Sequence, residues 1–578
     1  MRITLGKLAY KKINSTGKKV LTYDGNINNE DLSLEFSTKQ ENGGQHITIT
    51  LLPKTELILK ECTLRTDAKF TEETPIYLNG YQTWTDSREF KINETIPRLN
   101  PIVRPIMAMY GDYRFYKHNK NALHSWTYTY IREKNLISFV GSLIEKTGYT
   151  LFQYDKKEKN LVIVKDSVDL VVNKPRILFD IFIAQGEEHD IFDKYFSTGN
   201  YSAPRVEPCT GWTSWYNYYT KVTEKDILEN LEAFSSRKLP IDIFQIDDGY
   251  QHAVGDWLNI NEKFPNGMKA LADKIRANGY KAGLWLAPIV CEKNSDIYKK
   301  HPEWVVAKAG YNPGWSGNFY TLDFYNEEVR QYLREVFDTV LNKWNYDLVK
   351  LDFLYAVALI KRDDKTRGEI MYEFMEFLRE IVGDKLILGC GVPLGPAFGL
   401  VDYCRVSSDV DLTWENKFGS TMNYRERVST INALTSTIGR QHLDKRVFLN
   451  DPDVFILRSE NNSLTEDQKY TLFLLNILLG SLTFTSDNIN SYSKKQMEIF
   501  KIMLKWKNKK INSVSQGEVV RVDFEVEDVK YVSFSNLTSN RGTIVLDSSG
   551  SIVENGQVVG KGGALTLLPY QSLCLKKS

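Results

Sequence analysis

Residues 241–251, IDIFQIDDGYQ, indicate the fold class, because a short apolar run ends directly in two aspartates, Asp247 and Asp248. Residues 346–355, YDLVKLDFLY, repeat the pattern and place Asp352 just after a second apolar run. Apolar runs of this length, with polar residues at their carboxyl ends, are typical of buried parallel strands that carry an active site. The two stretches therefore predict strands of an α/β protein.

Six further apolar runs resemble these two, and stretches with helical periodicity lie between them. Eight strand-helix units in about 300 residues are typical of a (β/α)8 TIM barrel, and a doubly wound sheet is the weaker alternative. The six runs are CTGWTSW (209–215), KAGLWLAP (281–288), LILGCGVP (386–393), DYCRVSSD (402–409), RVFLNDPD (446–453) and SLTFTSDN (481–488).

The segments on either side of these units have the alternating pattern of β-sheets. The proline-containing stretch YSAPRVEPCTG at 201–211 and the end of the helical pattern near Lys505 mark the boundaries. We therefore expect an N-terminal β-sandwich domain at 1–200, a catalytic barrel at 201–505 and a C-terminal β-sandwich domain at 506–578.

The composition is that of a globular protein with no electrostatic attraction to nucleic acid or to an anionic membrane. Of 578 residues, 42% are hydrophobic, and 74 basic residues against 73 acidic ones leave a net charge of +1. There is no apolar leader and no run of about 18 apolar residues. Six cysteines stand without CxxC spacing. These features predict a cytoplasmic protein with reduced thiols.

Carboxylates follow most of the predicted strands, so they should meet at one rim of the barrel. Besides the three aspartates quoted above, Asp409 and Asp411 follow Arg405. Any single aspartate is as readily a helix cap or a turn residue, and we interpret Asp451, Asp453 and Asp487 in that way.

A converging set of carboxylates near tryptophans fits a metal site or a sugar site. The seven histidines include no HxH or HExxH spacing, which disfavours a metal, although an acidic, oxygen-rich magnesium site stays open as an alternative. No phosphate-binding loop and no GxSxG motif is present. We therefore predict carbohydrate cleavage by two carboxylates, with no metal and no cofactor.

The ordered motifs resemble glycoside hydrolase family 36, the melibiase-type alpha-galactosidases, over nearly the whole chain. The resemblance implies an N-terminal β-supersandwich, a central barrel, a C-terminal β domain and hydrolysis of terminal alpha-linked galactose. It rests on NGYQTW (79–84), GWTSWYNYY (211–219), FQIDDGYQ (244–251), GLWLAP (283–288), KLDFLYA (350–356), LGCGVPLGP (388–396), RVSSDV (405–410) and FLNDPD (448–453).

The resemblance also implies roles. Asp352 would be the nucleophile and Asp409 the general acid/base; Asp411 is the alternative, but Asp409 keeps the family's spacing to Arg405. The other positions would bind galactose: Asp247 and Asp248 its outer hydroxyls, Lys350 and Arg405 as donors around the ring, Trp285 and Trp215 as walls, Cys390 near the 2-hydroxyl, and Trp84 reaching over from the N-terminal domain.

Charge arguments complete the expectation. Lys350 lies two residues before Asp352 and should lower its pKa, while the charge of Asp352 should raise the pKa of Asp409. A retaining mechanism requires carboxyl groups roughly 5 to 6 Å apart, against about 6.5 to 9.5 Å for inversion. Three alternatives stay open: an alpha-N-acetylgalactosaminidase, a raffinose-synthase-type galactosyl transferase, and a non-catalytic carbohydrate-binding barrel. The predicted partner is a galactose-terminated oligosaccharide or glycan, and a homo-oligomer stays open.

Overall fold

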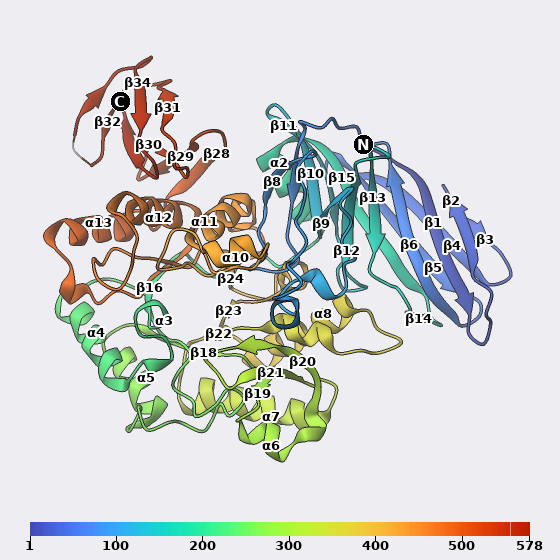
Figure 1. Ribbon diagram of the computed structural model, residues 1–578, viewed down its shortest axis with the longest axis horizontal. Coiled ribbons are helices and arrows are strands. Elements are labelled where there is room, and N and C mark those ends of the chain that lie inside the picture. The colour runs from blue at the N-terminus through green and yellow to red at the C-terminus, as the bar shows by residue number, and fades with distance from the viewer. Residues whose placement is uncertain (555) are drawn as a thin grey trace.

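The N-terminal third is built from two antiparallel sheets, and the computed structural model describes residues 1–554 and 556–578. One sheet has the order β2-β1-β6-β13-β12-β9, with β14 beside β6; the other has the order β3-β4-β5-β15-β11-β10-β7-β8. The two sheets form one end of the molecule (Figure 1), and an apolar core built from residues of both lies between them. The strands are β1 (Ile3–Lys12), β2 (Lys19–Tyr23), β3 (Ile27–Asn28), β4 (Leu32–Glu41), β5 (Gly44–Pro53), β6 (Leu57–Thr66), β7 (Pro75–Leu78), β8 (Arg88–Lys91), β9 (Ala122–Trp126), β10 (Tyr128–Glu133), β11 (Leu136–Ser142), β12 (Thr150–Asp155), β13 (Asn160–Lys165), β14 (Val171–Val172) and β15 (Arg176–Glu187).

The central part holds a parallel sheet of nine strands, in the order β25-β24-β23-β22-β18-β17-β16-β27-β26. All eight predicted strands are present, and the seventh is divided into β25 and β26 by Pro452 and Asp453. The strands are β16 (Cys209–Thr213), β17 (Ile243–Ile246), β18 (Lys281–Leu286), β22 (Leu348–Leu351), β23 (Leu386–Gly389), β24 (Tyr403–Arg405), β25 (Leu449–Asp451), β26 (Val454–Phe455) and β27 (Leu482–Thr485).

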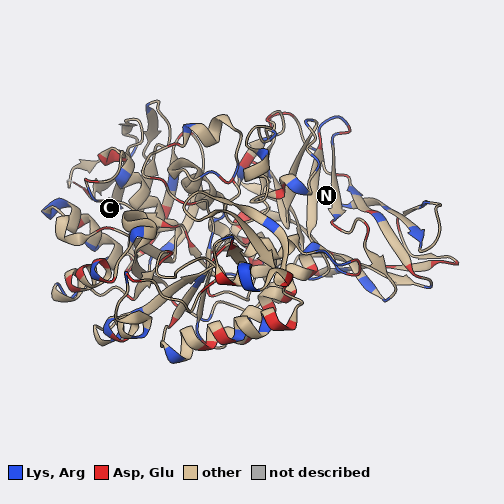
Figure 2. Ribbon diagram, turned by 60° about the horizontal axis from the view of Figure 1, so that its bottom comes forward, with Lys and Arg blue, Asp and Glu red and all other residues tan. Residues whose placement is uncertain are grey.

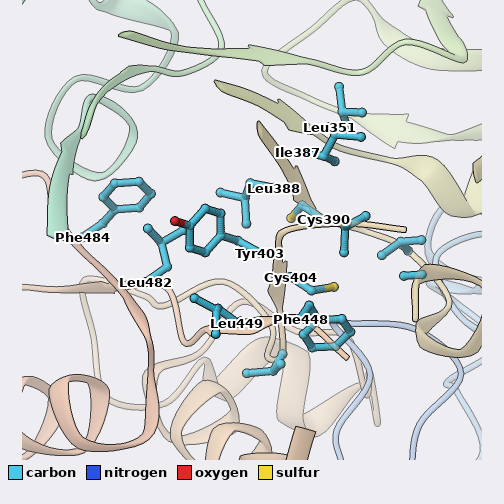
Figure 3. Close-up of a cluster of buried hydrophobic side chains, with 14 of the residues drawn as sticks. Leu351, Ile387, Leu388, Cys390, Tyr403, Cys404, Phe448, Leu449, Leu482 and Phe484 are labelled. Carbon is cyan, nitrogen blue, oxygen red and sulfur yellow. The ribbon is translucent and has the colours of Figure 1, made fainter. Parts of the chain in front are cut away.

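This sheet is curled. Leu388, Tyr403 and Leu449 come from β23, β24 and β25, yet they gather with Leu482 of β27 in one buried cluster (Figure 3). Strands that are far apart in the sheet order can share a cluster only if the sheet bends back on itself. The carboxyl ends of the strands consequently face one common rim.

Helices separate the parallel strands. Capping boxes at Thr223, Thr366, Thr465 and Ser493 fix the starts of four of them by satisfying free backbone N–H groups. The longer helices are α4 (Glu224–Ser236), α5 (Gly267–Ala277), α7 (Glu327–Asp338), α8 (Arg367–Val382), α11 (Thr430–Gly439), α12 (Glu466–Leu479) and α13 (Lys494–Lys505), with α2 (Glu188–Thr198) preceding the sheet. The shorter ones are α1 (Arg104–Met107), α3 (Trp215–Tyr218), α6 (Asp296–Lys300), α9 (Leu394–Ala397) and α10 (Lys417–Thr421).

Two smaller β structures complete the chain. A three-stranded sheet, β19 (Val290–Glu292), β21 (Gly317–Leu322) and β20 (Val305–Asn312), lies outside the parallel sheet, and the sequence pattern did not predict it. The C-terminal strands lie against α12 (Figure 1), and a hydrogen bond joins the hydroxyl groups of Thr471 and Ser572 there. They are β28 (Lys510–Ser515), β29 (Val520–Val526), β30 (Val529–Ser535), β31 (Gly542–Val545), β32 (Gly550–Ile552), β33 (Val558–Val559), β34 (Ala564–Leu567) and β35 (Ser572–Lys577).

Side-chain chemistry across the molecule matches the composition. Basic and acidic residues are intermixed along the chain in Figure 2, and the net charge is near zero. All six cysteines are buried and unpaired. Among residues 1–554 and 556–578, no helix combines the length and apolarity that a membrane crossing would need.

Candidate active site

The parallel strands bring the predicted residues to one rim. Asp247 and Asp248 follow β17, Asp352 follows β22, and Cys390 follows β23, while Arg405 ends β24. Because β17, β18, β22, β23 and β24 are consecutive neighbours in the sheet, these side chains come from adjacent positions along its carboxyl edge. All five residues are buried.

Lys350 forms its ion pair with Asp247, with 2.8 Å between Nζ and Oδ2. Asp247 Oδ2 also accepts a hydrogen bond from Gln245 Nε2 at 2.9 Å. Burial alone would lower the pKa of Lys350, but the Asp247 carboxylate outweighs burial and raises it. The lysine is therefore a permanent cation that orients Asp247, rather than the direct partner of Asp352 that the sequence suggested.

Asp352 is held by two hydrogen bonds. Its Oδ2 accepts one from Trp285 Nε1 at 3.1 Å, and its Oδ1 accepts one from the Phe353 backbone at 2.8 Å. Burial raises the pKa of Asp352; Lys350 opposes this rise, and the charge of Asp409 adds to it. Lys350 lowers the pKa of Asp352 as expected, but desolvation exceeds the attraction of a lysine that is already paired with Asp247, so the net shift is upward.

Arg405 lies among three carboxylates. Its guanidinium contacts Asp409 at 2.6 Å, Asp451 at 3.0 Å and Asp453 at 2.9 Å. Burial raises the pKa of Asp453, which Arg405 opposes, and the same carboxylate accepts hydrogen bonds from Tyr216 Oη and the Val410 backbone. A single cation thus holds two buried carboxylates and the predicted acid/base in one cluster.

The interpretation of Asp451, Asp453 and Asp487 as caps or turn residues misses their main contacts. Asp451 and Asp453 bind Arg405, and Asp487 forms a completely buried ion pair with Arg458 at 2.6 Å. Asp453 does lie in a turn, with φ of 79°, between β25 and β26. Their interior positions require a cation, because a buried carboxylate without one is costly.

Asp409 and Asp411 differ in environment. Asp409 contacts Arg405, and its side chain is 32% exposed, so it can reach a bound molecule. Asp411 accepts hydrogen bonds from the Leu412 backbone at 2.7 Å and from Thr413 Oγ1 at 3.0 Å. These hydrogen bonds stabilise the loop that contains Asp411. The local role of Asp411 favours Asp409 as the functional residue.

Asp248 is bound at both oxygens. Gln251 Nε2 donates to Oδ1 at 2.6 Å, and Trp315 Nε1 donates to Oδ2 at 2.8 Å. Burial raises the pKa of Asp248 to about 6. Trp315 lies in the turn between β20 and β21, and its ring lies edge-on to Trp285 with the centroids 6.4 Å apart. The sequence analysis missed this residue.

The remaining predicted positions lie around these carboxylates. Trp84 comes from the N-terminal part, and its ring meets the edge of Phe353 at 5.2 Å between centroids, directly after Asp352. A Cβ added at Gly391, beside Cys390, would clash with Trp84 at 2.9 Å. Trp215 opens α3 and is half-buried. The Cys390 thiol is buried, and the charges of Asp352 and Asp409 both affect it.

A family model described as Melibiase matches residues 186–385. This segment resembles a melibiase domain. The family resemblance predicted from the motifs is thereby confirmed, and the matched segment contains Asp247, Asp248, Lys350 and Asp352. Arg405 and Asp409 lie beyond the matched segment.

Known proteins that are similar to part of this chain are named alpha-galactosidases. Alpha-galactosidase Mel36A of Lactobacillus acidophilus is 28% identical over 196 residues, which are 31% of this chain and 26% of that protein. Bifunctional alpha-galactosidase/sucrose kinase AgaSK of Mediterraneibacter gnavus is 29% identical over 186 residues, which are 31% of this chain and 20% of that protein. The matched segments therefore span between a fifth and about a quarter of these relatives.

Solved structures match over more of the chain. TtGalA, an alpha-galactosidase from Thermus thermophilus in complex with p-nitrophenyl alpha-D-galactopyranoside, has a TM-score of 0.71 at 25% identity, covering 88% of this chain and 98% of that one. The GH36 alpha-galactosidase AgaA from Geobacillus stearothermophilus has a TM-score of 0.64 at 14% identity, covering 95% of this chain and 81% of that one. The second likeness shows a shared fold.

The candidate active site includes residues that the sequence analysis did not predict. Tyr216 follows the predicted Trp215 and binds Asp453, and Gln251 closes the FQIDDGYQ motif. Both residues lie inside motifs that the sequence analysis quoted, so their positions could have indicated that they belong to the site. Trp315 follows no apolar strand and gave no such signal. Among the described residues, no group of three or more His, Cys, Asp or Glu is arranged to hold a metal ion.

Proposed function

We propose that this protein is a retaining, exo-acting alpha-galactosidase with Asp352 as nucleophile and Asp409 as general acid/base. The observation that carries the proposal is the placement of Asp352 directly after β22 and of Asp409 in the loop after β24, with only β23 between these strands. The two residues are near enough that the charge of Asp409 raises the pKa of Asp352. Two carboxylates that interact in this way suit double displacement, in which one attacks carbon and the other transfers protons.

The cycle follows from their contacts. Trp285 and the Phe353 backbone hold the Asp352 carboxylate by one oxygen each, so a lone pair stays directed at the anomeric carbon. Protonated Asp409 would give its proton to the departing glycosidic oxygen as Asp352 forms the glycosyl-enzyme. Asp352 is then neutral, and Asp409 accepts a proton from the attacking water.

Recognition of galactose is assigned to the other rim residues. Asp247 and Asp248 would accept hydrogen bonds from the outer hydroxyls, and Lys350 and Arg405 would donate around the ring. Trp84, Trp215 and Trp285 would supply walls, and Cys390 would adjoin the 2-hydroxyl. The substrate class is a galactose-terminated oligosaccharide or glycan, in keeping with the named ligands of similar proteins.

The architecture that supports this site is, in our proposal, a closed (β/α)8 barrel at 201–505 between a β-supersandwich at 1–200 and a C-terminal β domain at 506–578. Closure is supported by the sheet order, whose two ends, β25 and β26, are successive segments of the chain. An eight-stranded parallel barrel has its active site at the rim where these carboxylates lie.

Azide rescue tests the two roles. Asp352→Ala and Asp409→Ala should each reduce turnover of an aryl alpha-galactoside by at least about a thousandfold. Azide should restore activity in both, giving the beta azide from Asp352→Ala and the alpha azide from Asp409→Ala, because only the second still forms a covalent intermediate. Proton NMR identifies each product, and the opposite pair of anomers would overturn the assignment.

A substrate panel separates the alternatives. Wild-type enzyme with aryl alpha-glycosides should prefer the galactoside, and the first-formed galactose should be the alpha anomer by NMR. Preference for the 2-acetamido sugar would indicate an alpha-N-acetylgalactosaminidase. Product dominated by a new disaccharide at high acceptor concentration would indicate a galactosyl transferase.

A further inference from the structure

A cavity lies where the segment between β8 and β9 meets the central part of the chain. It has a volume of about 220 Å³, and most of its lining comes from residues 96–124, with Arg425 from the loop before α11. The helical turns of this segment, blue in Figure 1, lie beside the central sheet. None of the residues assigned to the galactoside site lines this cavity.

Unpaired cations surround its opening. Arg98, Arg104 and Lys117 line the cavity and are exposed. Within residues 1–554 and 556–578 none of the three has an acidic partner within ion-pair distance, unlike Arg88, Arg132 and Arg425, which are each paired with a carboxylate. Three like charges on one rim repel each other, and an anion between them would remove that repulsion.

The cavity floor supplies a buried guanidinium. The Arg425 side chain is 5% exposed and contacts Asp86 through Nε at 2.5 Å, which leaves Nη1 without a hydrogen-bond partner. A buried donor without a partner is costly, and an acceptor oxygen supplied by a ligand would offset that cost.

The acidic group of the lining is already engaged. Asp112 Oδ2 accepts hydrogen bonds from His124 Nε2 at 2.7 Å and from Trp126 Nε1 at 2.9 Å. Counting Asp86 and Glu426, whose charges both act on Arg425, three carboxylates face four basic side chains, so the cavity keeps an excess of positive charge. This excess favours an anion as the occupant.

We propose that this cavity binds a phosphoryl group, either as free phosphate or as the phosphate monoester of a small sugar. Guanidinium groups match phosphate oxygens with paired hydrogen bonds, and a dianion compensates several cations where a single carboxylate compensates one. The volume is smaller than the roughly 300 to 1,000 Å³ of sites for drug-sized ligands, which limits the occupant to about the size of a hexose phosphate.

The sugar part would meet the remaining lining. Ile96, Pro97 and Leu99 are apolar, and Tyr116 is stacked on His124 with 3.7 Å between ring centroids. An aromatic face beside a charged group suits a ligand with an apolar ring face and a phosphate. The proposal does not depend on the glycosidase activity proposed above.

Calorimetric titration of the full chain tests the site with inorganic phosphate and with galactose 6-phosphate. Arg98→Gln combined with Lys117→Gln should weaken phosphate binding by at least about tenfold, since charge-assisted contacts are lost. Lys120→Gln, on the same segment but outside the lining, is the matched control and should stay within about twofold.

Galacturonate, a sugar with a single carboxylate, should bind at least about tenfold more weakly than the phosphate probes. Tighter binding of galactose 6-phosphate than of phosphate supports the ester, and the reverse order supports the free ion. Equal affinity of the double variant and the wild type, or of galacturonate and phosphate, would overturn the proposal. The substituted residues are exposed, so folding of the variants is checked simply by an unchanged melting temperature.

Discussion

At the scale of single residues, Asp248 is buried, and both of its carboxylate oxygens accept hydrogen bonds. Gln251 and Trp315 each donate to one oxygen, and burial still raises the pKa to about 6. An acid whose pKa is higher in the folded state binds protons more tightly there than in the unfolded chain. Its contribution to stability is therefore complete at low pH and declines as the pH rises through 6.

Asp248→Asn should reveal this dependence. The free energy of unfolding of the variant, minus that of the wild type, should become more positive by about 1.4 kcal/mol between pH 5 and pH 8, because only the wild type loses the proton. Urea denaturation at the two pH values measures the difference. A difference that does not change with pH would show that the Asp248 carboxyl titrates near its ordinary value.

The motifs predicted which residues meet at the rim better than they predicted how those residues pair. Spacing placed Lys350 of β22 on the same face as Asp352, but the lysine contacts Asp247, which follows β17, on the far side of β18. Likewise Arg405 binds Asp451 and Asp453, which follow it in sequence by more than forty residues. Such pairs depend on which strands are adjacent, and a one-dimensional pattern carries that information only after the sheet order is known.

At the scale of elements, the β20–β21 hairpin places an indole at the rim without belonging to the parallel sheet. Asn312 pairs with Gly317, so residues 313–316 form the turn that carries Trp315. Glu292 accepts hydrogen bonds from the Ser316 backbone at 2.6 Å and from the Val254 backbone at 2.9 Å, which ties the turn to the loop after β17.

Replacing residues 313–316 by Asn-Gly should keep the hairpin, because the pair Asn312–Gly317 is retained and Asn-Gly favours a two-residue turn. The kcat/KM for an aryl alpha-galactoside should fall by about 100-fold through loss of the Trp315 ring and its hydrogen bond. Trp315→Phe is the matched variant, with an expected fall of about tenfold. Unchanged kcat/KM in both would remove Trp315 from the site.

The eight strands and five of the longer helices could be predicted from periodicity, because each buries an apolar run of the expected length. The β19–β21 sheet could not. Its strands include KAGYN at 308–312 and GNFYT at 317–321, which alternate weakly and contain glycine. Edge sheets of this kind owe their stability to neighbouring side chains rather than to their own pattern.

At the scale of the whole molecule, Arg440 joins the N-terminal sheets to the rim. It is completely buried at the end of α11 and donates to the carbonyls of Thr83 and Gln82, to Asn79 Oδ1, and to the Val406 carbonyl. Thr83 and Gln82 immediately precede Trp84, and Val406 follows Arg405. The same guanidinium therefore positions the reaching tryptophan and the loop of Asp409.

Arg440→Met should lower the free energy of unfolding by about 3 kcal/mol or more, because several buried acceptors lose their donor. Turnover should fall as well, since Trp84 is no longer fixed. Arg541→Met, an exposed arginine in the C-terminal part, should cost less than about 0.5 kcal/mol. Urea midpoints and kcat of both variants make the comparison, and similar losses for the two would contradict a joining role for Arg440.

The six interior cysteines give the protein a practical property. Because each thiol is covered and none is paired, maleimide probes should find no ready target on the folded chain. A cysteine introduced at an exposed position would then be the single point of attachment, without removal of the native thiols. Fluorophores or spin labels could in this way report the distance between the hairpin turn and the N-terminal sheets while substrate is bound.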